Sequence, residues 1–239
     1  MIEFNNPRSN EEFAQIIAES FQAFLSTNSR SNKKLKPLHS AIAKDLALML
    51  GEDYQIFSQG FNSGKEAKID GRYHSKAVDI TIQHNNKTVA GVAVKFIMQN
   101  YSQNSVNYFE TMLGETANIR SIGIPYFQII IMCDNLPYYD GERNIKHWEK
   151  FTEGNAMKYK KLSQDNPVLY IHTPDKTLIF LVHITENAKL TNKNAYVKFY
   201  QENQSMSIST QESPDFGNGV IYNDYEKFML KIYHKVMSL

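Results

Sequence analysis

The sequence predicts an α/β sandwich, in which helices flank a central mixed sheet. Apolar residues recur at helical spacing near both ends of the chain, at 11–26 and 224–239. Two segments rich in Val and Ile, 78–82 and 89–97, flank a short polar turn, as the strands of a β-hairpin do. The segment 125–133, PYFQIIIMC, is apolar almost throughout, which is typical of an inner strand covered by helices on both faces.

Up to the hairpin, the sequence predicts two helices, a short strand and a turn-rich bridge. Ser9 and Asn10 precede the first helix and are its candidate caps. In order, these elements are a helix at 11–26, a helix after Pro37 that Gly51 ends, a strand at 54–58 and the bridge at 59–76.

After the hairpin, helices and strands alternate. In order, we expect a helix at 103–120, the strand at 125–133, a polar helical segment at 140–165, a strand at 176–184 and a helix at 224–239. Trp148 and Phe151 are the expected anchors of the polar segment. The length favours one domain over 1–239, with a motif-bearing core at about 38–135 and residues 136–239 completing or decorating it.

Composition limits the classes of function. The 26 basic and 25 acidic residues give a net charge of +1, so any electropositive surface for nucleic acid must be local. The single cysteine, Cys133, cannot form an intrachain disulfide, which suits a reducing compartment. The N-terminus lacks the pattern of a signal peptide and no apolar run is long enough to span a bilayer, so we expect a cytoplasmic protein.

The hairpin carries the candidate chemistry. Asp79 near the start of its first strand and Lys95 near the end of its second can meet at one end of the hairpin. Hydrolysis of a phosphodiester needs a divalent cation, an activated water and a positive charge near the phosphate. Asp79 can ligate Mg²⁺ and Lys95 can orient the water or stabilise the phosphate. A structural salt bridge between the two residues is an equally good reading.

A second acid is absent from the lysine strand, because Ala93 stands two residues before Lys95. The following helix can supply one. Its stripe Gln103, Asn107, Glu110, Gly114 and Ala117 includes two small residues, which suits close approach to the sheet and would bring Glu110 to the strand ends. Glu115 lies elsewhere around the helix and is the alternative acid; a surface or capping role is the alternative for both.

The segments VDI (78–80) and VAVKF (92–96) resemble the PD-(D/E)xK nuclease superfamily, which includes most type II restriction endonucleases. Val78 replaces the proline of the family name, and Ala93 replaces the second acid. Some members have that acid on the helix after the lysine strand, and Glu110 is close to this pattern. The resemblance implies a restriction-endonuclease-like sandwich in which Asp79, Glu110 and the Val94 carbonyl bind Mg²⁺ and Lys95 assists the attacking water.

Polar segments around the hairpin are candidate DNA contacts. Amide side chains can pair with adenine edges, and tyrosine can contact the backbone. The candidates are Asn100, Tyr101, Gln103 and Asn104 after the lysine strand, and Arg72, His74 and Lys76 before Asp79. Arg30, Lys33, Lys34 and Lys36 in the basic segment 27–36 are further candidates for phosphates. Ordinary polar loops are the alternative reading. His74 has no histidine or cysteine partner at metal-ligand spacing, so no zinc site is expected.

The leading hypothesis is a Mg²⁺-dependent, sequence-specific endonuclease of a restriction system, acting on double-stranded DNA. A homodimer is expected, because cutting both strands of a palindromic site needs two symmetric centres. The alternative is an inactive nuclease-fold module that binds DNA or a protein. Ala93 as an engineered substitution that traps substrate is a third reading.

Overall fold

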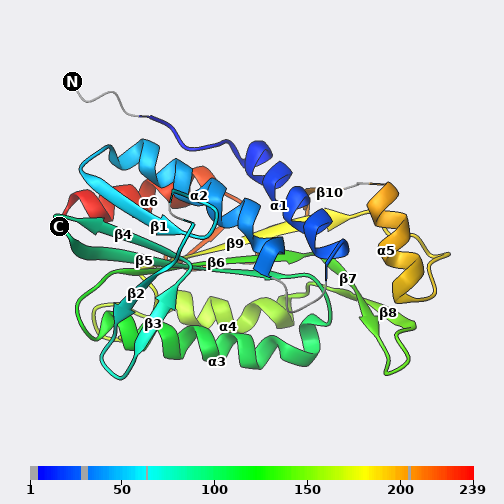
Figure 1. Cartoon of the computed structure of the whole chain (residues 1–239). Helices are drawn as coiled ribbons and strands as arrows, with labels where there is room; N and C mark the ends of the chain where they lie inside the picture. Colours follow the sequence, from blue (N-terminus) through cyan, green and yellow to red (C-terminus); the bar gives the residue numbers. More distant parts are fainter. Residues whose placement is uncertain (1–4, 28–31, 63, 204–205) are drawn as a thin grey trace.

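The computed structural model describes residues 5–27, 32–62, 64–203 and 206–239 of the chain. Helices cover both faces of a twisted seven-stranded sheet (Figure 1). The predicted α/β class with a mixed sheet flanked by helices is confirmed. In the described part of the chain, no helix combines the length and the apolar character needed to cross a bilayer.

The sheet is antiparallel at its edges and parallel at its centre. Its first three strands pair antiparallel, β5 pairs parallel with β6 and β6 with β9, and β10 is antiparallel to β9. The strand order is β1 (Tyr54–Ser58), β4 (Ile80–His84), β5 (Lys87–Ile97), β6 (Tyr126–Cys133), β9 (Lys176–Ile184) and β10 (Met206–Ile208), with the short β11 (Val220–Tyr222) also pairing with β9. Every residue of β6 is buried, including Cys133, as predicted for an inner strand.

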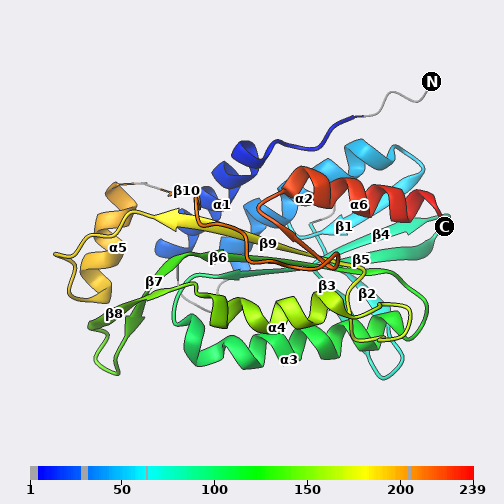
Figure 2. The same ribbon diagram turned by 180° about the vertical axis from the view of Figure 1, so that it is seen from behind.

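Two helical layers enclose this sheet. The helices α1 (Asn10–Leu25), α2 (Lys36–Leu50) and α6 (Tyr225–Met237) lie on one face, and α3 (Tyr101–Arg120) and α4 (Glu153–Gln164) lie on the other (Figures 1 and 2). A short 3₁₀ helix, η1 (Asn32–Leu35), precedes α2, and α5 (Lys193–Glu202) lies beyond the β9 end of the sheet. Two small hairpins complete the fold: β2 (Ala67–Asp70) with β3 (Ser75–Val78), and β7 (Asn135–Tyr139) with β8 (Ile145–Lys150).

Local signals in the sequence position several of these elements. The Ser9 hydroxyl caps α1, and the Glu12 carboxylate accepts from the Ser9 backbone N–H. The helix begins one residue before the predicted start. Gly51 ends α2 with a φ of 81°, a conformation that glycine adopts without strain. Asn85 and Asn86 both have positive φ and form the turn between β4 and β5, which confirms the predicted hairpin.

The segment 140–165 is only partly helical, so that prediction was wrong in its first half. Residues 145–150 form β8 and pair with β7, and Trp148 lies opposite Pro137. The helix α4 begins only after Thr152, whose side chain and that of Asn155 cap it reciprocally. Phe151 is buried as expected. The sequence patterns did not predict α5, β7, β10 or β11, and the β2–β3 hairpin lies inside the predicted bridge.

One irregularity of the sheet positions the candidate site. Pairing between β4 and β5 ends at Ile80 opposite Val92. The preceding strand β3 leaves the sheet and pairs with β2, with Val78 opposite Ala67. Asp79 lies at this junction between β3 and β4, where the chain separates from β5. The separation leaves the backbone of β5 beyond Val92 without a ladder partner on this side and opens a cleft beside it.

Candidate functional site

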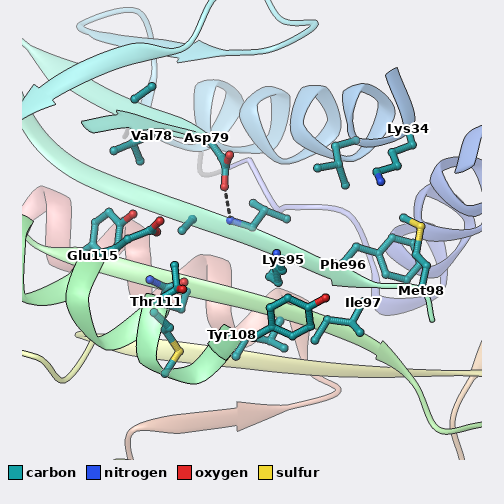
Figure 3. A pocket seen from close by; sticks show the side chains of 18 of the residues that line it. Lys34, Val78, Asp79, Lys95, Phe96, Ile97, Met98, Tyr108, Thr111 and Glu115 are labelled. Carbon is teal, nitrogen blue, oxygen red and sulfur yellow. Dashed lines mark hydrogen bonds between the residues drawn. The ribbon is translucent and has the colours of Figure 1, made fainter. Parts of the chain in front are cut away.

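The carboxylate of Asp79 occupies the gap between β3 and β5. The backbone N–H of Val94 donates a hydrogen bond of 2.7 Å to its Oδ2 (Figure 3). On the other side, the Ser58 hydroxyl donates to the Asp79 carbonyl oxygen at 2.8 Å. Both the backbone and the side chain of Asp79 are therefore positioned by neighbouring strands, while the second carboxylate oxygen remains available to the cleft.

Lys95 points into the cleft from β5. Its neighbours Val94 and Phe96 are buried on the opposite face, whereas Lys95 is exposed. Its ammonium lies 4.3 Å from the centre of the Tyr108 ring, which comes from α3. The geometry therefore does not bury Lys95 in an ion pair with Asp79, and a purely structural salt bridge does not explain why this lysine interrupts an apolar strand.

The cleft has a volume of about 500 Å³ and is lined by Asp79, Ala93, Lys95 and Glu115 together with two further lysines and with polar and apolar residues (Figure 3). Glu115 comes from α3 and is partly buried. Lys76 on β3 forms an ion pair with it, with 2.5 Å between Nζ and Oε1. The cleft is thus lined by two acids from separate elements, and the Lys76 ammonium lies against the second of them, Glu115.

The acids are electrostatically coupled. The pKa of Asp79 is raised from 3.8 to about 6, mainly by burial and in smaller part by repulsion from Glu115. The hydrogen bond from Val94 and the positive charges of Lys76 and Lys95 oppose this rise in pKa. A cation in the cleft would therefore stabilise the charged form of Asp79 more than it would stabilise an exposed carboxylate.

The structure does not place Glu110 in this cleft. Glu110 is exposed, it is absent from the lining of the cleft and it is not among the charges that shift the pKa of Asp79. The stripe predicted to face the sheet faces solvent instead: a Cβ added at Gly114 would meet no atom within 4 Å. The buried side of α3 consists of Tyr101, Ser105, Met112, Thr116, Asn118 and Ile119. Glu115, the alternative acid, is the one that reaches the cleft.

Val94 contacts Asp79 through its N–H. In an extended strand the N–H and C=O of one residue point to the same side, so the Val94 carbonyl also points toward the gap that Asp79 fills. Its predicted role as a metal ligand stays a prediction. Ala93 does not leave an empty space at the position of the missing second acid, because its methyl group packs in a small apolar cluster with Ile69, Val78 and Tyr126.

The expected DNA contacts lie in three places. Tyr101 is buried, so the expected surface contact through its side chain does not hold. Asn100 directly precedes α3 with a φ of 49°, and its side chain donates to that of the exposed Gln103. Asn104 is partly exposed. Their contacts with DNA stay predictions.

Arg72 and His74 are exposed in the turn between β2 and β3. The buried Asn118 on α3 fixes this turn, because its Oδ1 accepts from the Tyr73 N–H at 2.9 Å and its Nδ2 donates to the His74 carbonyl at 3.0 Å. The turn is therefore held at a defined position on α3, at the end of the β2–β3 hairpin away from Asp79.

Of the basic segment, Lys34 lines the cleft. Its pKa is lowered by burial first and then by repulsion from Lys95 and Lys193. Lys36 begins α2 and is exposed. Arg30 and the side chain of Lys33 lie outside the described residues.

No family model, no curated protein and no solved structure matches this chain.

Proposed function

We propose that the protein is a Mg²⁺-dependent endonuclease of double-stranded DNA with a restriction-endonuclease-like sandwich. The observation that carries the proposal is the convergence of Asp79, Glu115 and Lys95 in one cleft from three different elements. Asp79 and Lys95 are the residues of the sequence motif, and Glu115 supplies the acid that Ala93 lacks.

The donors fit a hard divalent cation. Mg²⁺ takes one or two carboxylates from a protein and fills its other positions with water and substrate. Asp79 and Glu115 provide these carboxylates, and the Val94 carbonyl points to the same gap. The Lys76 ammonium already places a positive charge beside Glu115, as a bound metal ion would. Mg²⁺ would supply a polarised phosphate and a more acidic water.

The positively charged residues in and near the cleft would act on the water, the phosphate and the DNA backbone. The Lys95 ammonium is free of any ion pair with Asp79 and Glu115, so it can orient the attacking water and stabilise charge on the phosphate. Lys76 and Lys34, which line the cleft, would hold the DNA backbone. Arg72 and His74, exposed in the β2–β3 turn, would contact it farther along. These local cations account for DNA binding by a chain whose net charge is only +1.

The proposal extends to the assembly and the setting. Cutting both strands of a symmetric DNA site requires two such clefts, which a homodimer supplies. Sequence-specific cleavage within a restriction system fits a cytoplasmic enzyme whose one cysteine stays reduced.

A catalytically inactive nuclease-fold module that binds DNA or a protein is the second candidate. The packing of Ala93 with Ile69, Val78 and Tyr126 favours it, because this side chain lines the cleft and offers no ligand to a metal. The two candidates share the fold and differ only in whether metal-dependent cleavage occurs.

Cleavage of plasmid and phage DNA with Mg²⁺ or Mn²⁺ tests the proposal. We expect nicking or double-strand cutting by the wild type. Glu115→Gln should lower the rate at least about 100-fold, since it removes a charged metal ligand, whereas the matched variant Glu110→Gln should cut at the wild-type rate.

Intact DNA in every metal and sequence tested, with DNA retained in a binding assay, would instead support the inactive module. Loss of cutting in Glu110→Gln but not in Glu115→Gln would return the role of second acid to Glu110.

A further inference from the structure

A buried histidine next to the cleft has no hydrogen-bond partner. His39 lies in the first half of α2 and its side chain is 1% exposed. Neither ring nitrogen forms a hydrogen bond with any residue that the structure describes. Buried polar atoms in folded proteins are nearly always paired, so an imidazole left unpaired on both nitrogens indicates a ligand that the protein alone does not show.

Two carboxylates converge on this imidazole. One ligand atom each from His39, Glu66 and Asp79 lies within 4.8 Å of the other two. The pairing of Ala67 with Val78 places Glu66 directly across from Asp79, one step beyond the last pair of the β2–β3 hairpin. The loop before Glu66 rests on α2, where the Ser40 hydroxyl donates to the Gly60 carbonyl at 2.9 Å. The cluster is therefore built from three separate elements.

We propose that His39, Glu66 and Asp79 bind a divalent transition-metal ion such as Co²⁺, Mn²⁺ or Zn²⁺. Donor atoms that each lie about 2.0–2.2 Å from a shared ion are about 3–4.4 Å apart, so small side-chain movements close the cluster around an ion. Asp79 can contribute the carboxylate oxygen that does not accept from Val94. A nitrogen donor distinguishes this site from an all-oxygen Mg²⁺ site, because imidazole suits first-row transition ions.

The protonation states fit this role. Burial lowers the pKa of His39 to about 4, so the ring is neutral at pH 7 and its nitrogen lone pair is available to a metal. Burial also raises the pKa of Glu66, and repulsion from Asp79 raises it further. An ion between the three groups would relieve this repulsion and partner the unpaired imidazole. Glu66 and Asp79 are partly exposed, so the ion can reach the cluster from their side.

This site goes beyond the proposed nuclease activity. It shares only Asp79 with the pair of acids proposed to hold Mg²⁺, and metal binding at His39 and Glu66 does not require DNA or cleavage. If both sites are filled, Asp79 lies between the two ions.

The experiment titrates Co²⁺ and, separately, Mg²⁺ into EDTA-treated full-length protein, followed by calorimetry and by the visible absorption of Co²⁺. We expect His39→Gln and Glu66→Gln each to weaken Co²⁺ binding at least about tenfold. His39→Gln should change Mg²⁺ binding less than Co²⁺ binding, because Mg²⁺ prefers oxygen ligands.

Two matched variants control for nonspecific losses. His183→Gln removes an exposed histidine that contacts Asp134 and should leave Co²⁺ binding unchanged, as should Glu110→Gln. Should His39→Gln fail to fold, the partly exposed Glu66→Gln decides the question. Wild-type protein that does not bind Co²⁺, or binding that survives both His39→Gln and Glu66→Gln, would overturn the proposed site.

Failure of this site and failure of the nuclease are separable. Glu115→Gln should keep Co²⁺ binding while losing cleavage. Protein that binds Co²⁺ through His39 but leaves all DNA intact would retain the metal site and overturn only the nuclease proposal.

Discussion

At the scale of single residues, the cleft depends on how Asp79 is held. Its carboxylate accepts a hydrogen bond from a main-chain amide, which lowers its pKa. The folded-state pKa is nevertheless raised to about 6, because the group is buried and lies near a second acid. Burial therefore outweighs the hydrogen bond. A charged Asp79 destabilises the metal-free protein, and this cost is the reason that a bound cation would stabilise it.

The raised pKa of Asp79 gives a pH-dependent prediction for Asp79→Asn in EDTA. The folded state favours the protonated acid, so the stability linked to this group is present below its unfolded pKa of 3.8 and is lost as pH rises through about 6. The asparagine cannot ionise and can still accept from Val94. The variant should therefore match the wild type in free energy of unfolding near pH 3.5 and exceed it at pH 8.

Denaturant unfolding at the two pH values measures this difference, with Asp53→Asn as the control at an exposed aspartate. An Asp79→Asn protein no more stable than the wild type at pH 8 would show that burial does not penalise the charge.

At the scale of elements, the inner strand β6 and the turn between β4 and β5 were easier to predict than the orientation of α3. The apolar sequence of β6 leaves few alternatives, and Asn85 and Asn86 specify the hairpin turn. The helix α3 instead buries Thr116 and Asn118, whose partners are the Gln128 side chain and the β2–β3 turn. Such partners are distant in the sequence, so no periodic pattern marks that face.

The same limitation explains the outcome for the site. Asp79 directly precedes the first strand of the β4–β5 hairpin and Lys95 lies on its second strand, so the sequence alone predicted their proximity. The stripe of small residues predicts an inner face of α3 that carries Glu110, whereas the inner face carries buried polar residues, and Glu115 reaches the cleft instead. His39 and Glu66 were missed because three elements must assemble before they converge, and the spacing along the chain carries no trace of this.

Two glycines in different surroundings give a prediction about stability, Gly91 at the packing between β5 and β6 and Gly114 on α3. A Cβ at Gly91 would lie 2.9 Å from the ring of the fully buried Tyr126 and 3.2 Å from Ile69. Gly91→Ala should therefore lower the free energy of unfolding by about 1–3 kcal/mol through overpacking. Gly114→Ala, on the open face of α3, should raise it by about 0.5–1 kcal/mol, because alanine favours the helix.

Thermal or denaturant unfolding of the two variants compares these effects directly. A stabilised Gly91→Ala protein would show that Tyr126 can move at little cost. A destabilised Gly114→Ala protein would show that the face carrying Glu110 is packed rather than exposed.

At the scale of the whole molecule, a buried polar cluster joins the two ends of the chain. Asp45 on α2 is nearly inaccessible and accepts from the Tyr225 hydroxyl at 2.7 Å, and Arg8 forms an ion pair with it. The ring of Tyr225 stacks on Phe13 at 3.8 Å between centres. The N-terminal segment, α1, α2 and α6 are thereby fastened together on the face of the sheet that also carries His39.

Asp45→Ala should lower the free energy of unfolding by about 3 kcal/mol, because it leaves Arg8 and the buried Tyr225 hydroxyl without their partner. Denaturant unfolding measures this loss, and Asp53→Ala is the matched exposed control. Equal stabilities of the two variants would show that the cluster does not hold the helices together.

The attachment of Asp79 to a main-chain amide has a consequence for how such a site can evolve. An amide is present whatever side chain residue 94 carries, so drift in the neighbouring positions leaves the first acid in place. Substitutions at positions 93 and 94 can therefore leave this hydrogen bond in place as long as β5 keeps its path.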